Sequence, residues 1–199
     1  MSYITPKGRF RLKLNVQYAL KDKDGNAKPI FQENSLARFL IGKKGWLSPL
    51  WINKWYAAFI TPFLGSWANT RLVSNIVTNV GHAGVASRIN GAGGEAAFTW
   101  IALGTGTVAA AAGDTALEAE ISTGGLARVN STVSRVTTGT TNDTAQNQHT
   151  FAATASFAVT ESGVFNAASA GVLLARQTFS AVNVVNGDSL QVTWRFDVN

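Results

Sequence analysis

The most constraining feature of the sequence is the strict alternation of apolar and polar residues in its strand-length stretches. In residues 189–198, "SLQVTWRFDV", every second side chain is apolar and the intervening ones are polar or charged. Residues 9–18, "RFRLKLNVQY", alternate in the same way, with basic side chains among the polar ones. A period of two residues is typical of a strand with one buried and one solvated face. The two stretches therefore predict strands near both ends of the chain.

Between these two stretches, from residue 71 onward, the chain consists of short apolar runs separated by Gly, Asn, Thr and Ser. One short helix is predicted over "TNVGHAGVASRING", with Thr78 or Asn79 as its N-cap and Asn90-Gly91 at its end. Four further stretches are predicted as strands: "AAFTWIAL", which we expect to be fully buried, "LARVNSTVSRVTT", "QHTFAATASFAV" and "GVLLARQTFSAV". The pattern indicates an all-β fold, an antiparallel β-sandwich of Ig-like or jelly-roll type.

The composition changes near residue 70. The first 70 residues carry eleven basic and three acidic side chains and all four prolines, whereas the remaining 129 carry six arginines, no lysine and eight acidic side chains. A chain of 199 residues with 46% hydrophobic residues suits one domain with an extension. It has no cysteine, so a disulfide framework and a thiolate metal site are excluded. We therefore predict a basic, Trp-rich arm over residues 1–70 and a sandwich domain over residues 71–199.

Residues 45–67, "GWLSPLWINKWYAAFITPFLGSW", hold four of the six tryptophans and a single charge, Lys54. Pro49 and Pro62 leave only twelve residues between them for an unbroken helix, and Lys54 lies near the middle. A membrane-spanning helix needs about 20 residues, so no span is expected. Because the stretch is apolar on nearly all sides, it predicts a helical segment that is buried either in the core of the chain or against a partner.

Asp24-Gly25 predicts a tight β-hairpin turn after the first strand, with "KPIFQ" returning as the partner strand. The same region has the ligand spacing of an EF-hand calcium loop at Asp22, Asp24, Asn26 and Glu33. Ala27 stands where that loop needs glycine, and the residues before it alternate like a strand instead of a helix. The hairpin turn is favoured, calcium stays the alternative, and no cofactor is expected.

Residues for catalysis are few. The chain has two histidines, His82 and His149, and no nucleophile motif accompanies them. Glu118 and Glu120 are two positions apart, so on a helix they would point to different faces and would not form an acid-base pair. The "GTGT" stretch at 104–107 lacks the signature of a phosphate-binding loop. We expect no enzyme, although a glycan-cleaving module with two suitably spaced carboxylates remains an alternative.

Several stretches of the C-terminal two thirds resemble a known family. They are "IALGTGT" at 101–107, "TESGVFNA" at 160–167, "LLARQTFSA" at 173–181 and "NGDSLQVTW" at 186–194. Together they resemble small β-sandwich structural proteins of tailed bacteriophages, of the head-decoration, collar or tail-fibre type, over about residues 75–199. The resemblance implies a protein that is made in the bacterial host cytoplasm, is built into the virion and works by contact. It implies no catalytic residues.

We therefore expect a non-enzymatic virion protein, a decoration or accessory protein attached to the capsid through its N-terminal arm. A tail, collar or fibre position is the alternative, so the expected partners are the major capsid protein or neck and tail proteins. Open sheet edges and the closed symmetry of most assemblies favour a homo-oligomer. The expected docking residues of the arm are Trp46, Trp51, Trp55, Phe59, Phe63, Trp67, Lys43, Lys44, Lys54, Arg9, Arg11 and Lys13.

The basic first strand raises nucleic acid as another partner, because clustered Lys and Arg side chains neutralise phosphates. In the predicted strand, however, Phe10 and Tyr18 lie on the opposite face from Arg9 and Arg11. Bases that stack on these aromatic rings could not lie beside the charges. A solvated or partner-facing basic strand is favoured over direct nucleic-acid binding.

Overall fold

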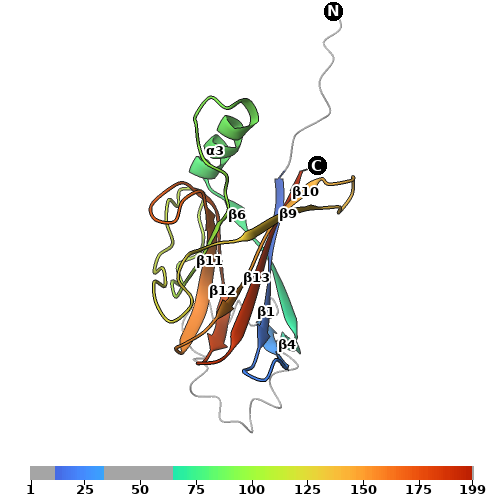
Figure 1. Cartoon of the computed structure of the whole chain (residues 1–199), viewed down its shortest axis with the longest axis vertical. Coiled ribbons are helices and arrows are strands. Elements are labelled where there is room, and N and C mark those ends of the chain that lie inside the picture. The colour runs from blue at the N-terminus through green and yellow to red at the C-terminus, as the bar shows by residue number, and fades with distance from the viewer. Residues whose placement is uncertain (1–11, 34–64, 199) are drawn as a thin grey trace, which may run out of the picture.

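The computed structural model describes residues 12–33 and 65–198. They form two main sheets that pack face to face, a small third sheet and one helix, with all strand pairs antiparallel (Figure 1). The larger sheet has the order β2-β1-β13-β10-β9, and β5 also pairs with β1. Its strands are β1 (Leu12–Lys21), β2 (Ala27–Lys28), β5 (Thr70–Ser74), β9 (Thr132–Val136), β10 (Thr144–Ala152) and β13 (Ser189–Val198). The predicted all-β sandwich is confirmed.

The second sheet has the order β6-β12-β11-β7-β8, and the small sheet consists of β3 and β4. The strands of the second sheet are β6 (Ile76–Val77), β7 (Trp100–Gly104), β8 (Val129–Asn130), β11 (Phe157–Phe165) and β12 (Leu173–Val184). The small sheet pairs β3 (Ile30–Glu33) with β4 (Gly65–Ala68), at the opposite end of the sandwich from the helix. Among the described residues, no helix has the length and apolar character needed to cross a bilayer.

The core lies between the two main sheets and is built from the alternating strands. Leu190, Val192, Trp194 and Phe196 of β13 are buried, as the alternation of residues 189–198 predicts. The indole N–H of Trp194 donates to the Ser162 hydroxyl at 3.1 Å, so the polar atom of the largest buried ring has a partner. Burial of such alternating apolar side chains is the main force that holds the sheets together.

The first strand belongs to this sandwich. β1 pairs with β13 along its whole length, from Leu12 opposite Val198 to Lys21 opposite Ser189. On the β1 face directed inward, Val16, Tyr18 and Leu20 are buried in the core. The sequence placed this strand in an arm because its charges differ from those of the rest of the chain. Charge, however, describes only the outward face of a strand, and the structure places β1 inside the larger sheet.

The stretch "QHTFAATASFAV" does not form the single strand predicted for it. β10 ends at Ala152 and β11 begins at Phe157, and the two strands belong to different sheets. The connection lies against the turn before β13, because Ala153 donates to the Asp188 carbonyl at 2.8 Å and accepts from Gly187 at 2.8 Å. Ala153 is buried like Phe151 and Val159, so the alternating pattern continues through the bend and conceals it.

The hairpin turn at Asp24-Gly25 is confirmed, since Lys21 of β1 pairs with Ala27 of β2. The return strand is shorter than predicted, because only β2 pairs with β1 and the residues after Pro29 join β4. Proline has no N–H to donate, which favours this interruption.

The predicted helix is confirmed as α3 (Asn79–Asn90), with Thr78 as N-cap and Gly91, in the left-handed conformation, as C-cap. The Thr78 hydroxyl accepts from the Gly81 N–H at 2.9 Å and donates to the Leu173 carbonyl, so the cap also ties the helix to β12. α3 stands at one end of the sandwich, above the second sheet. It lies so close to β12 that a Cβ atom at Gly81 would come within 2.2 Å of the Leu174 carbonyl oxygen.

Residues 105–128 form a long connection that contributes a second apolar cluster to the second sheet. Leu117 of this connection packs with Ala102, Phe165 and Leu173 in that cluster, whereas Ile101 and Leu103 belong to the main core. Both faces of β7 are therefore buried, as its continuous apolar run predicts.

Candidate docking site

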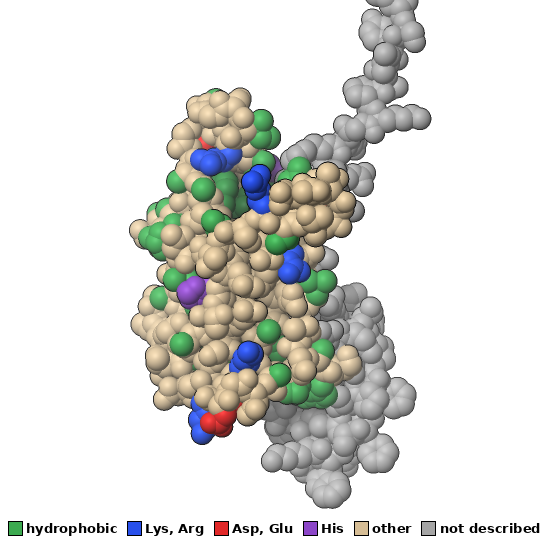
Figure 2. Space-filling view, turned by 45° about the vertical axis from the view of Figure 1, so that its right-hand side comes forward, with side chains coloured by type: hydrophobic (Ala, Val, Ile, Leu, Met, Phe, Trp, Pro, Cys, Tyr) green, Lys and Arg blue, Asp and Glu red, His purple; other side chains and the backbone are tan. Residues whose placement is uncertain are grey.

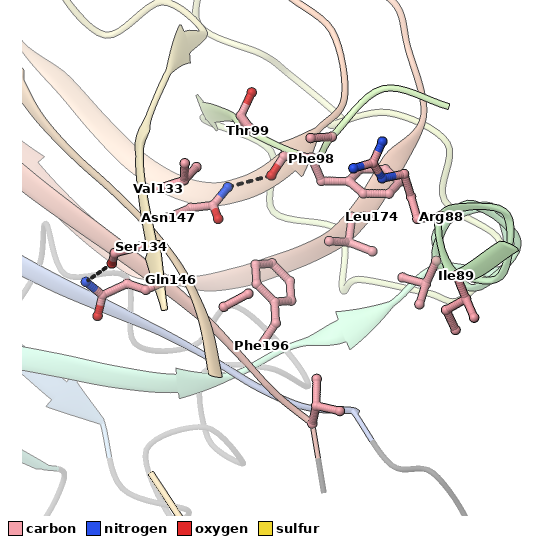
Figure 3. A pocket seen from close by; sticks show the side chains of 14 residues that line it. Arg88, Ile89, Phe98, Thr99, Val133, Ser134, Gln146, Asn147, Leu174 and Phe196 are labelled. Carbon is pink, nitrogen blue, oxygen red and sulfur yellow. Dashed lines mark hydrogen bonds between the residues drawn. The ribbon is translucent and has the colours of Figure 1, made fainter. Parts of the chain in front are cut away.

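An apolar groove of about 600 Å³ lies at the α3 end of the sandwich, between the helix and the larger sheet (Figure 3). Phe196 of β13, Leu174 of β12 and Phe98 point toward this space, and Ile89 borders it from the helix. The described residues that line it are Val85, Arg88, Ile89, Ala97, Phe98, Thr99, Val133, Ser134, Ala145, Gln146, Asn147, Leu174, Phe196 and Val198.

The groove exists because a helix, instead of another strand, faces the larger sheet at this end. Val133 pairs with Asn147 and Ala145 pairs with Phe196, so these lining residues share the inner face of the sheet. The second sheet contributes only Leu174 to the lining. A single helix cannot fill the width that a sheet would cover, and the end of the sandwich stays open.

The wall formed by Phe98 and Thr99 is fixed by hydrogen bonds. The Asn147 side chain donates to the Phe98 carbonyl at 2.7 Å. The Thr99 carbonyl accepts from the Ser131 N–H at 2.7 Å and from its hydroxyl at 2.6 Å. Gly84 lets the Phe98 ring pass beneath the helix, because a Cβ there would lie 2.6 Å from the ring. The groove is therefore built into the fold.

Large apolar side chains remain exposed around the groove. Ile89 is 75% exposed, Val133 55% and Val198 44%. Among the described lining residues, Arg88 carries the only charge, and it donates to the Glu95 carbonyl at 3.2 Å. In Figure 2 hydrophobic side chains show in the hollow below the helix, with basic side chains nearby (Figure 2). Such a surface binds apolar groups, and contiguous exposed apolar patches of this kind mark interaction sites.

A buried ionic cluster lies on the other face of the second sheet. Glu161 is fully buried and accepts from Arg176 Nε at 2.9 Å, while Arg176 Nη1 donates to Asp114 at 2.7 Å. The Glu161 carboxylate also accepts from the N–H groups of Gly106 at 3.1 Å and Ala119 at 2.7 Å. These bonds fasten the 105–128 connection to the sheet. The cluster therefore holds the fold together.

The ion pairs shift the pKa values of two groups in this cluster. Burial lowers the pKa of the Arg176 guanidinium, but its bonds with Asp114 and Glu161 outweigh burial and raise it. Burial raises the pKa of Asp114. Hydrogen bonds from the Ala111 N–H and from Arg176 outweigh this effect, so the pKa of Asp114 is lowered. Both groups are thus held in their charged forms.

The two carboxylates considered as an acid-base pair have separate partners. Glu120 pairs with Arg128, whose guanidinium also lies 3.6 Å above the centre of the Phe165 ring. Glu118 accepts from the Val108 N–H at 2.7 Å. Of the histidines, His82 lies on α3, and His149 of β10 packs against Phe151, where burial lowers its pKa.

Three residues of the calcium alternative, Asp22, Asp24 and Asn26, lie in the hairpin turn, whereas the fourth, Glu33, lies in β3 opposite Gly65. One oxygen of Asp22 accepts from the N–H groups of Asp24 and Asn26 at 2.9 Å each. These bonds, led by those from Asn26, lower the pKa of Asp22. In the described ranges, no three His, Asp or Glu side chains gather in a way that could hold a metal ion.

Of the predicted docking residues, the structure describes Trp67 in full. Its ring lies 5.3 Å from that of Phe31 on the small sheet and is 63% exposed, at the end opposite the groove. Lys13 has its backbone in β1, opposite Asp197. The other predicted residues lie outside the described ranges: Arg9, Arg11, Lys43, Lys44, Trp46, Trp51, Lys54, Trp55, Phe59 and Phe63.

Sequence reasoning missed both the groove and the ionic cluster. Glu161 and Arg176 did leave a signal, because each is a charged residue inside an apolar strand stretch. The groove left no such signal, since its lining comes from α3, residues 97–99 and four strands, which are brought together only by the fold.

Comparisons with protein-family models, with curated proteins and with solved structures found no match. The resemblance of residues 75–199 to phage structural proteins therefore stays a prediction.

Proposed function

We propose that this protein is a non-enzymatic structural protein of a tailed-phage virion, a decoration or accessory protein attached to the capsid. It attaches through its N-terminal region. The protein itself is a homo-oligomer. The observation that carries the proposal is the exposed ring of Trp67, which lies 5.3 Å from the ring of Phe31 and is the last residue of the Trp-rich stretch 45–67. The sequence resemblance of residues 75–199 gives independent support.

The chemistry of the segment between β3 and β4 suits docking. Residues 34–64 contain four basic side chains and no acidic one, together with Trp46, Trp51 and Trp55. Tryptophan side chains that enter desolvated pockets dominate interface energies, at about 2 kcal/mol or more each. The partner surface is therefore apolar with acidic surroundings, and the lysines face its charges.

The pairing of the small sheet allows a clean test of this docking. Glu33 lies directly opposite Gly65, so residues 34–64 leave and re-enter the sandwich at one point. A short Gly/Ser linker in their place would close β3 and β4 into a hairpin without disturbing either strand. We expect this variant to keep the circular-dichroism spectrum and melting temperature of the sandwich and to be lost from purified particles.

A chain with residues 34–64 in scrambled order serves as the control for segment length and composition, and it too should be lost from particles. Normal incorporation of the linker variant would contradict the docking role. An insoluble linker variant would instead show that the segment completes the core of its own chain.

The position in the virion is decided by copy number. Quantitative mass spectrometry of purified particles would measure this protein against the major capsid protein and the portal. A number close to that of the capsid protein supports decoration of the head. A number close to that of the portal supports the second candidate, a neck, tail or fibre position. Absence from particles would favour nucleic-acid binding, which should weaken steeply as salt rises.

A further inference from the structure

The groove lies where the first strand begins. Leu12 is paired with Val198 and Leu14 with Phe196, and both partners on β13 line the groove. Neighbouring strands are about 4.8 Å apart, so β1 starts one strand spacing from the groove lining. Residues 1–11 therefore connect to the sandwich at the edge of the groove.

The sequence of these residues has the pattern that the groove needs. In β1 the buried residues Val16 and Tyr18 occupy alternate positions, and continuation of this period along the sequence predicts Phe10 on the inner face. The same continuation of the sequence pattern predicts Arg9 and Arg11 on the outer face, away from Arg88 in the groove wall. Tyr3 and Ile4 add two further large apolar side chains before them.

We propose that residues 1–11 of the same chain occupy the groove and place Tyr3, Ile4 and Phe10 against its apolar lining. The path from β1 across β13 and β10 to β9 covers three strand spacings, about 15 Å. Eleven residues reach up to about 36 Å when extended, so the segment is long enough. Tethering at Leu12 keeps its local concentration in the millimolar range, which favours this segment over any free peptide.

Cross-linking in the full chain tests the proposal, because the protein has no cysteine of its own. The first variant carries Ile4→Cys with Ile89→Cys, which places one thiol on the segment and one beside the groove. The matched control carries Ile4→Cys with Thr141→Cys. Thr141 is exposed in the loop between β9 and β10, at the same end of the sheet but outside the groove. This loop is joined to the end of β13, because the Val198 N–H donates to the Asp143 carbonyl at 3.1 Å, and Val198 is paired with Leu12 at the start of β1.

We expect an intrachain disulfide that forms at least tenfold faster in the Ile89 variant than in the Thr141 variant, at a rate independent of protein concentration. Mass spectrometry of non-reduced peptides and non-reducing gels would report both quantities. Equal rates in the two variants would overturn the proposal. So would interchain disulfides that increase with concentration, because they would assign the groove to a neighbouring copy.

A second measurement does not depend on cross-linking. The dye ANS fluoresces when it binds exposed apolar surface, and Tyr3→Ser with Ile4→Ser should raise its fluorescence at least twofold by uncovering the groove. These residues precede β1, so the fold is expected to survive, which circular dichroism would check. Lys7→Ser is the control on the same segment and should leave the signal unchanged. An unchanged signal in the double variant would overturn the proposal.

Discussion

Single charged residues in the second sheet act as anchors for the connection that covers it. Glu161 alone accepts from Arg176 and from the N–H groups of three residues, Gly106, Glu118 and Ala119. Gly104 and Gly106 lie so close that a Cβ at either would fall within 2.5 Å of the Glu161 carboxylate. A buried charge without such partners would be strongly destabilising, and the complete set of bonds explains why this one is tolerated.

Substitution of Glu161 tests this role. Glu161→Gln removes the charge opposite Arg176 and turns an amide N–H toward backbone N–H groups that need an acceptor. Breaking one side of a buried ion pair costs about 3–5 kcal/mol, so we expect a loss of that size in the free energy of unfolding by urea.

The matched control is Glu120→Gln. Glu120 also pairs with an arginine but is 30% exposed, so solvent replaces much of the lost interaction. We expect Glu120→Gln to lower the free energy of unfolding by about 1 kcal/mol or less. Equal losses of unfolding free energy in the two variants would show that burial does not make the Glu161 ion pair more important for stability than the exposed one.

At the scale of elements, α3 is placed by its glycines. The helix was predictable from Thr78 and Asn90-Gly91, because caps are local signals. The packing of the helix against β12 was not predictable, because the sequence identifies Gly81 only as a poor helix former. In the structure its backbone lies so close to β12 that a Cβ atom there would come within 2.2 Å of the Leu174 carbonyl oxygen. The position of the helix, and with it the groove, depends on that contact.

Two glycine-to-alanine substitutions separate helix propensity from packing. Each raises the intrinsic stability of the helix by about 1 kcal/mol. At Gly81 the new Cβ meets the Leu174 backbone 2.2 Å away, which cannot move without disturbing β12. We expect Gly81→Ala to lose about 1–3 kcal/mol of unfolding free energy in urea.

At Gly84 the obstacle is the tip of the Phe98 ring, which can shift toward the groove. Gly84→Ala should therefore cost less than Gly81→Ala and should reduce the groove volume. A stabilising effect of Gly81→Ala would show that α3 is not docked in this way.

At the scale of the whole molecule, the chain closes on itself through its two ends. β1 pairs with β13, so the first and last described strands lie side by side in the larger sheet. The groove is lined by Val198 at the end of β13, where β1 begins, and the small sheet, whose β4 carries Trp67, lies at the other end of the sandwich. Two surfaces suited to contact thus face in opposite directions.

This closure predicts which shortened chains fold. A chain that begins at residue 71 lacks β1 and loses Val16, Tyr18 and Leu20 from the core. Each buried side chain of this size contributes about 1.5–3 kcal/mol, and their sum is comparable with the total stability of a domain. We expect the chain that begins at residue 71 to show no cooperative melting transition, whereas a chain that begins at residue 12 should melt cooperatively. A cooperative transition for residues 71–199 alone would instead support the domain boundary drawn from composition.

The local features could be predicted from the sequence: the alternating strands, the Asp24-Gly25 turn, the two ends of α3 and the buried character of β7. Each depends on residues a few positions apart, and period and caps report such short-range preferences directly. Four features could not be predicted: the place of β1 beside β13, the division of "QHTFAATASFAV" between two sheets, the bonding of Glu161 with Arg176 and the groove below α3. These features depend on which distant residues meet, and a buried position has the same apolar signature whichever sheet it faces.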